Sequence, residues 1–164
     1  VQTCALPISQ EKMVLELSNA GQKSMAENVL LFNTLQTLRS NQNTAKMMSS
    51  VKRIFKFSGR SILKDDFDMS EYDNLFGKFV FKKRIPTWMN PPVVSDLLIT
   101  RMFSFCPSLI DTYLQVIQNN LPIIQKGLDT EHAHFVNIPK EHLIEFDELH
   151  CFRSEEHTSE LQSH

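Results

Sequence analysis

The sequence predicts an all-α fold, either an irregular bundle or a helical-hairpin array of six to seven helices. Apolar residues recur at steps of three and four over most of the chain, which is the spacing of one helix face. The segments between these stripes are short and carry glycine, proline or asparagine, so neighbouring helices are expected to be antiparallel. With 164 residues, 41% of them hydrophobic, the chain can bury the core of one domain.

Three helices are expected in the first third of the chain. Apolar residues share one face over residues 10–17 and again over 24–39, with Gly21 as the break between these two helices. Residues 44–57 continue the pattern, and Gly59 ends the third helix because glycine adopts the left-handed conformation at little cost. The stripes are formed by Met13, Val14, Leu17, Met25, Val29, Phe32, Leu35, Leu38, Met47, Val51, Ile54 and Phe55.

Residues 70–77 and 78–85 differ in character. Ser70 and Asp73 form a capping pair for a short helix that closes at Gly77. The following run, KFVFKKRI, is aromatic and β-branched, which predicts one strand. Because no second run of that quality exists in the sequence, this strand near 78–85 is expected to be isolated or to pair with chain outside this fragment.

The second half is also predicted to be helical. Pro92 opens the central helix, which is apolar nearly all round as far as Phe103. A regular stripe follows at residues 110–117 and ends before a further short turn that begins near Pro122, while the last helix opens at Pro139. The expected inner faces include Leu98, Ile117, Leu143, Phe146 and Leu149, with Leu98 and Ile117 on the two strongest stripes.

Neither end of the chain follows a helical or a strand period, and the C-terminal tail is polar. Residues 1–8 read VQTCALPI and residues 153–164 read RSEEHTSELQSH. These two segments resemble the translation of a sequencing adapter read from its two strands. The resemblance implies that residues 1–9 and 153–164 are non-native segments that do not fold. The native part, about residues 10–152, is then expected to be a single helical domain and a fragment of a larger protein.

Charge and cysteine content exclude several classes of protein. The 17 Lys and Arg against 19 Asp and Glu give a formal charge of −2, which supplies no overall field for nucleic acid or anionic lipid. With 4 Gly the composition is unlike collagen or low-complexity chains, and no segment has the pattern of a membrane span. Three scattered cysteines are too few for a disulfide framework, so we expect an intracellular location, either cytoplasmic or nuclear.

The densest group of metal-ligating side chains lies near the C-terminus. On a strand, His132 and His134 would point to one face, and His142 could complete a metal site. The alternative is a polar loop that binds no metal. The sequence shows no glycine-rich phosphate loop, Walker lysine or Rossmann fingerprint, so no cofactor and no catalytic residues are expected in this fragment. It is not expected to be a catalyst by itself.

Two basic segments, residues 52–64 and 78–84, offer a nucleic-acid interpretation. Their cations alternate with phenylalanines, and such rings could stack on bases while the charges meet phosphates. The simpler alternative is that the rings belong to the core and the cations flank them in solvent. The cations concerned are Lys52, Arg53, Lys56, Arg60, Lys82, Lys83 and Arg84.

Taken together, these patterns favour a helical scaffold or a protein–protein interaction module within a larger protein. Phe79, Phe81, Trp88 and Met89 lie in a stretch that no predicted helix covers, and exposed together they would form a partner-binding patch. The partner is expected to be another protein or the remainder of the parent chain. Two alternatives stay open, a nucleic-acid-associated helical module that uses the basic segments and a helical segment of a larger enzyme. No protein family is recognised in the sequence.

Overall fold

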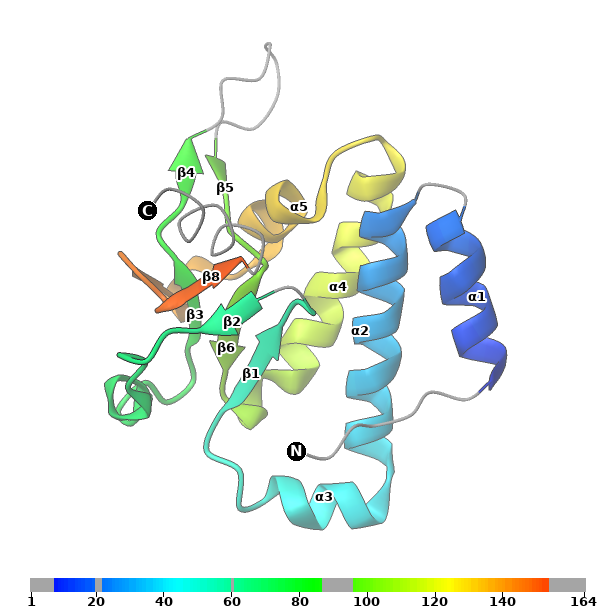
Figure 1. Ribbon diagram of the computed structural model, residues 1–164. Helices are drawn as coiled ribbons and strands as arrows, with labels where there is room; N and C mark the ends of the chain where they lie inside the picture. The colour runs from blue at the N-terminus through cyan, green and yellow to red at the C-terminus, as the bar shows by residue number, and fades with distance from the viewer. Residues whose placement is uncertain (1–7, 20–21, 60, 87–95, 154–164) are drawn as a thin grey trace, which may run out of the picture. The chain divides into compact units, whose positions relative to one another are not determined.

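The computed structural model describes four stretches of the chain, residues 8–19, 22–59, 61–86 and 96–153. They form two units (Figure 1). The helical unit contains the described residues of Val1–Val51 and Ser108–Ile138, and the sheet unit contains those of Lys52–Pro107 and Pro139–His164. The prediction of an all-α fold is wrong, because eight strands accompany the helices in the described chain. The fold is mixed α/β, and the interpretation as a helical repeat fails with it.

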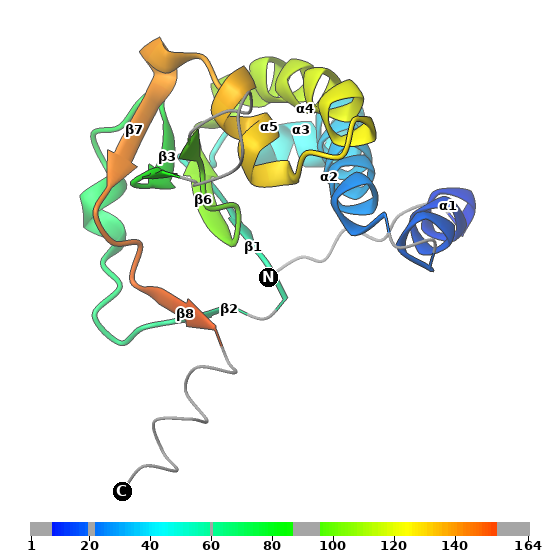
Figure 2. The ribbon, with the colours of Figure 1, turned by 90° about the horizontal axis from the view of Figure 1, so that it is seen from above.

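Five α-helices build the helical unit. The longest, α2, contains neither glycine nor proline, and it confirms the helix predicted over residues 24–39. The helix predicted over residues 10–17 is confirmed as α1. α2 packs against α1, α3 and α4, and α4 packs against α5 (Figures 1 and 2). The helices are α1 (Ile8–Asn19), α2 (Lys23–Ser40), α3 (Gln42–Met48), α4 (Ile110–Gln125) and α5 (Thr130–Asn137).

α4 continues through two residues that were predicted to lie beyond its end. The predicted stripe ends at residue 117, but Asn120 also lies in the helix, where its side chain is buried and hydrogen-bonded to neighbouring side chains. Pro122 lies inside the last turns of α4, where its missing N–H removes one intrahelical hydrogen bond without ending the helix before Gln125. α4 therefore extends beyond the end that the sequence predicts, because Asn120 finds buried hydrogen-bond partners and Pro122 is tolerated in the last turns.

A buried polar network joins α2, α4 and α5. Asn28 donates from Nδ2 to Thr130 Oγ1 at 3.0 Å. The side-chain amide of Asn120 lies 3.3 Å from Asn28 Oδ1 and 3.2 Å from His134 Nδ1, and the Tyr113 hydroxyl lies 2.9 Å from His134 Nε2. All five side chains are at most 3% exposed. Because a buried polar group without a partner is costly, this network helps to fix how the three helices pack.

Replacing Tyr113 with phenylalanine is expected to lower the free energy of unfolding by about 1–3 kcal/mol. The ring stays in place, while His134 Nε2 loses its hydroxyl partner in a buried site. Tyr72→Phe is the matched control, because the Tyr72 hydroxyl is buried and no described group bonds to it. Its removal should be neutral or slightly stabilising. Urea denaturation of both variants measures the two changes, and equal losses would contradict this account of the network.

The main sheet of the sheet unit has four strands in the order β1-β6-β3-β7. β6 pairs antiparallel with β1 and β3, and β7 pairs parallel with β3. Two further antiparallel ladders join β2 with β8 and β4 with β5. The strands are β1 (Ile54–Phe57), β2 (Ser61–Leu63), β3 (Phe79–Lys82), β4 (Ile85–Pro86), β5 (Asp96–Leu97), β6 (Met102–Phe105), β7 (Leu143–Phe146) and β8 (Cys151–Arg153).

Several segments predicted as helices are strands. The helix expected over residues 44–57 ends as α3 at Met48, and β1 follows it. β5 and β6 lie where the central helix was expected, and η3 (Lys140–His142) with β7 lies where the last helix was expected. The strand predicted near 78–85 is confirmed as β3, but it is not isolated, since it lies between β6 and β7. β6 is buried on both faces, and such a strand has the same continuous apolar pattern as a buried helix.

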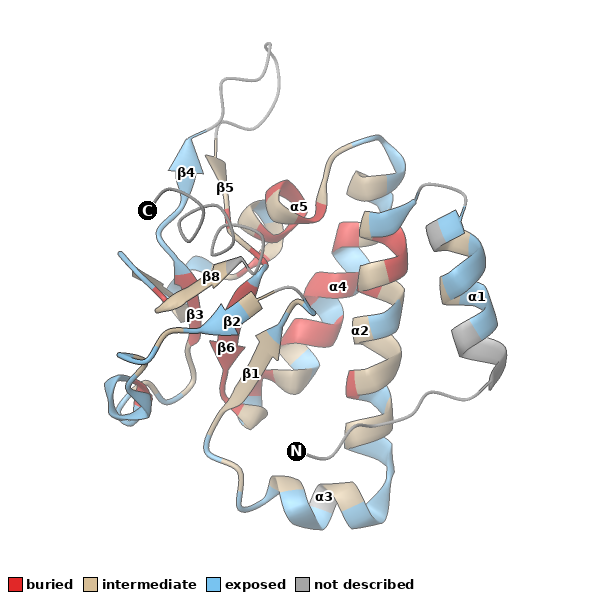
Figure 3. Cartoon of the chain, in the orientation of Figure 1, coloured by how far each residue is buried: buried red, intermediate tan, exposed pale blue. Residues whose placement is uncertain are grey.

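The two faces of the main sheet bury different side chains. On one face, a core of Tyr72, Val80, Met102 and Leu149 contacts further aromatic rings, among them Phe146. The ring of Tyr72 lies 5.4 Å from that of Phe146, measured between centroids. Figure 3 shows β6 and much of β3 coloured as buried. The sheet therefore has a largely apolar centre that supports the loops on this face.

The opposite face carries four phenylalanines. Phe79, Phe81, Phe103 and Phe105 are at most 1% exposed, and Phe81 stacks on Phe103 with ring centroids 4.6 Å apart. Phe79 and Phe81 therefore do not contribute to an exposed partner-binding patch. Leu98 and Ile117 are also fully buried, which confirms both as core positions although Leu98 is not on a helix.

Parts of the two predicted non-native segments belong to secondary structure. Ile8 and Ser9 begin α1, and Arg153 is the last residue of β8, where it pairs with Ser61. The other residues of these two segments lie outside the described residues.

Candidate functional site

The predicted metal ligands lie on different elements. His132 and His134 lie on α5 rather than on a strand, so the geometry assumed for a metal site is wrong. His132 Nδ1 lies 2.6 Å from Asp129 Oδ1, and His142 Nδ1 lies 2.9 Å from Gly77 O in the sheet unit. Within the described stretches, no group of three or more His, Cys, Asp or Glu side chains could hold a metal ion.

Several cations of the predicted nucleic-acid interface are paired with acids. Lys83 Nζ lies 3.0 Å from Asp147 Oδ1, and Arg84 Nε lies 2.9 and 3.1 Å from the two oxygens of Glu145. Arg60 lies outside the described residues. These pairs neutralise positive charge that phosphates would otherwise meet, so they give no specific support to nucleic-acid binding.

The remaining cations of that set differ in their surroundings. Lys52 and Lys82 are exposed. Lys56 donates from Nζ to Thr100 O at 2.8 Å and lies over the ring of Phe103. Arg53 is half-buried and forms part of the groove described next.

A groove of about 150 Å³ lies beside strand β1 in the sheet unit, and we call it the β1 groove. Its volume is on the scale of one large side chain. Its walls combine apolar side chains with two cations and one carboxylate. The lining residues are Lys52, Arg53, Phe55, Met69, Tyr72, Asp73, Leu75, Phe76 and Cys106.

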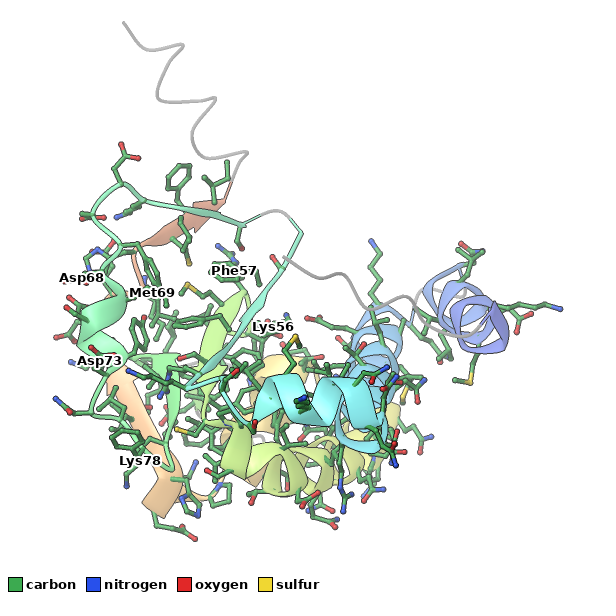
Figure 4. The ribbon with its side chains drawn as sticks, turned by 90° about the horizontal axis from the view of Figure 1, so that it is seen from below. Lys56, Phe57, Asp68, Met69, Asp73 and Lys78 are labelled. Carbon is green, nitrogen blue, oxygen red and sulfur yellow. The ribbon has the colours of Figure 1, made fainter. Side chains whose placement is uncertain are left out.

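A short 3-10 helix, η1 (Met69–Tyr72), forms one wall of the β1 groove. Asp68 caps it, because Ser70 N donates to Asp68 Oδ1 at 2.8 Å and Ser70 Oγ donates to Oδ2 at 2.7 Å. These hydrogen bonds lower the pKa of the Asp68 carboxyl from its ordinary value. The cap fixes a turn that buries Tyr72 and leaves Met69 61% exposed. Figure 4 shows Asp68, Met69 and Asp73 around this turn.

Arg53 ties the loop after η1 to the sheet. Its Nε donates to Ser104 Oγ at 2.8 Å, while Nη1 donates to Leu75 O at 3.0 Å and Nη2 to Lys78 O at 3.1 Å. The guanidinium carbon lies 5.4 Å from the centre of the Tyr72 ring. Burial lowers the pKa of Arg53 from its ordinary value. Because the Arg53 side chain bonds to both β6 and this loop, it positions Leu75 and Phe76 at the β1 groove.

Phe76 stands at the rim of the β1 groove and is 71% exposed. The next residue, Gly77, has φ of +64°, a left-handed conformation that favours glycine. Gly77 N donates to Cys106 Sγ at 3.2 Å, and this sulfur in turn donates to Leu75 O at 3.3 Å. The buried thiol therefore holds the loop from inside, and Phe76 faces solvent.

Neither of the two tyrosines is expected to ionise at its ordinary pKa in the folded protein. Burial raises the pKa of Tyr72 to about 12 and raises that of Tyr113 well above 10.0. Because the pKa of each tyrosine is higher in the folded state than in the unfolded state, burial of the neutral tyrosines contributes fully to stability below the unfolded-state pKa. This contribution is lost as the pH rises through the folded-state pKa. Phenolate absorbance should therefore rise only as circular dichroism reports alkaline unfolding. A tyrosine titrating near pH 10 before unfolding would contradict this.

The helical unit has a larger cavity of about 410 Å³ between the start of α2 and the end of α4. Its charged lining residues are Lys23 and Asp129. The Asp129 carboxylate caps α5 and lies beside His132. The structure thus assigns Asp129 to holding the start of α5, and the rim carries none of the large exposed apolar side chains found at the β1 groove.

No protein-family model matches the chain, and no curated protein matches it in sequence. In the described part of the chain, the helices are either too short or too polar to cross a membrane.

The sequence indicated only part of the β1 groove. Lys52 and Arg53 were candidates, but as phosphate-binding cations. Trp88 and Met89, which were expected in the partner-binding patch, lie outside the described residues. A helix was expected over residues 70–77, whereas η1 ends at Tyr72, so Phe76 lies beyond the helix. The Gly77 that follows marked the end of an element, but it did not show which way Phe76 points.

Proposed function

We propose that the sheet unit binds another protein through the β1 groove, which accepts an apolar side chain of that partner. The observation that supports the proposal is the exposure of Met69 and Phe76, 61% and 71%, around a groove also lined by Phe55 and Leu75. Exposed apolar side chains around a concave surface are typical of partner sites, since binding removes their area from water. An aromatic residue such as Phe76 at the rim fits the anchors found in protein interfaces.

The chemistry of the other lining groups favours binding over catalysis. The Cys106 thiol is buried and hydrogen-bonded on both sides, so it packs rather than presents a nucleophile. Arg53 directs its donors to carbonyls and to a serine hydroxyl of the same unit. Lys52 and Asp73 are exposed beside the groove, where they can select the charge of a bound segment.

A display library of random peptides, selected on the purified chain, tests the proposal. Selected peptides should share a large apolar residue, and Phe76→Ser should weaken their binding at least about 30-fold, the scale of an interface hot spot. Ile62→Ser is the matched control, because Ile62 is another exposed apolar residue of the sheet unit that does not line the groove. The affinity of the Ile62→Ser variant for the selected peptides should stay within about twofold of that of the original chain.

Thermal unfolding separates binding from folding in this test. Both changes replace exposed side chains, so the two variants should unfold within a few degrees of the original chain. The proposal fails if peptides bind the Phe76→Ser and Ile62→Ser variants equally well. It also fails if no selected peptide carries a large apolar residue that its binding requires.

A further inference from the structure

We infer that the segment bound at the β1 groove is extended and adds a strand to the outer edge of β1. This inference rests on the proposed function and deepens it by defining the conformation and chemistry of the partner. β1 is the end strand of the main sheet and pairs with β6 on one side, while no described strand pairs with its other side. An unpaired edge offers backbone donors and acceptors that match another extended chain.

The register shows which residues offer these groups. In an antiparallel pair, alternate residues of a strand direct their N–H and C=O toward the partner strand. Ser58 N donates to Arg101 O at 2.7 Å, so Lys56 and Ile54, at steps of two, also face β6. Phe55 and Phe57 therefore direct their backbone groups to the outer edge. No described backbone group pairs with them there.

The open edge and the β1 groove adjoin each other. Phe55 lies on β1 and lines the groove, and its ring contacts Tyr72 with centroids 5.1 Å apart. Side chains that lie opposite each other on neighbouring strands share a face of the sheet with Cβ atoms about 5 Å apart. A residue added opposite Phe55 would therefore place its side chain on the groove side of the sheet. One bound strand thus uses both the edge and the groove.

The charges near the edge favour an acidic residue in the bound segment. Lys52 and Arg53 line the groove against one carboxylate, that of Asp73. Lys52 is exposed, and no ion pair is found for it among the described residues. A lysine charge at the edge would oppose strand addition, but Lys56 Nζ donates to Thr100 O at 2.8 Å instead. The partner class is therefore an extended peptide with one large apolar side chain and a nearby carboxylate.

Methylating the backbone nitrogens of a selected peptide, one at a time, tests the added strand. Each N-methyl group removes one donor, so methylation at every second residue should weaken binding at least about tenfold, with the intervening positions tolerated. Phe57→Pro removes a backbone N–H that faces the outer edge of β1, so it should weaken binding of the same peptide. A proline at Ile62 would disturb the pairing of β2 with β8, so Ile62→Ser is again the control.

The outcomes separate this inference from the proposed function. If Phe76→Ser abolishes binding but every N-methyl peptide binds normally, the added strand is wrong and the groove remains. If losses fall at steps of three or four, the bound segment is a helix, which also overturns the added strand. If sedimentation shows a dimer that Phe57→Pro dissociates and peptides do not displace, a second copy occupies the edge and the inference fails. Should Phe57→Pro fail to fold by circular dichroism, the methylation pattern decides alone.

Discussion

Replacing Phe81 with alanine is expected to lower the free energy of unfolding by about 3–5 kcal/mol. Phe81 lies in β3, between β6 and β7, and its side chain is fully buried. Its ring stacks on Phe103 at a centroid distance of 4.6 Å and an interplanar angle of 11°. Alanine would remove the buried area and the aromatic contact and would leave a cavity, because packed surroundings relax only in part.

Lys82→Ala is the control for Phe81→Ala. Lys82 is the next residue of β3, and its side chain is exposed. This change should alter the free energy of unfolding by no more than about 0.5 kcal/mol. Urea denaturation measures both variants. A loss below about 1 kcal/mol for Phe81→Ala would mean that the four-phenylalanine face is not a packed core.

Replacing Arg53 with lysine is expected to cost about 3 kcal/mol although the charge is retained. The three nitrogens of the planar guanidinium reach Ser104 Oγ, Leu75 O and Lys78 O together. A single ammonium cannot reach all three acceptors, so carbonyl groups in a partly buried site would lose their donor. The loop that carries Phe76 would then be held less tightly, and binding at the β1 groove should weaken as well.

The reverse exchange at the neighbouring residue, Lys52→Arg, is the matched control. Lys52 is exposed, and its ammonium forms no hydrogen bond within the described chain. The exchange should change the free energy of unfolding by no more than about 0.5 kcal/mol. If Arg53→Lys is as mild as Lys52→Arg, the hydrogen bonds of Arg53 do not hold the loop.

Sequence periodicity predicted the helical unit better than the sheet unit. α2 and α4 are long, with 18 and 16 residues, and α4 carries a regular apolar stripe over several turns, which separates a helix from a strand. β1 and β7 have four residues each, and there the apolar spacing matched a helix by coincidence. Ile54 and Phe55 kept step with Met47 and Val51, yet α3 ends at Met48. A short strand gives too few residues for its period of two to prevail.

Sheet formation also depends on partners that are distant in sequence. β3 was identified from its aromatic and β-branched residues, but its neighbours were not. β6 is largely apolar on both faces, as a buried helix would be, and β7 has only four residues, whose apolar spacing also fits a helix. The β1 groove could be predicted even less. Its residues come from positions 52–55, 69–76 and 106, and only the register of β1 with β6 and the hydrogen bonds of Arg53 bring them together.

A chemical-shift titration of the isotope-labelled chain with a selected peptide tests the central claim most directly. The account predicts that amide signals change along residues 52–57 and 69–76 and at Cys106, the segments that form the β1 groove and the outer edge of β1. The same titration of Phe76→Ser should give little change at equal peptide concentration. Signal changes centred on α2, α4 or α5, with none at Phe76, would contradict the account.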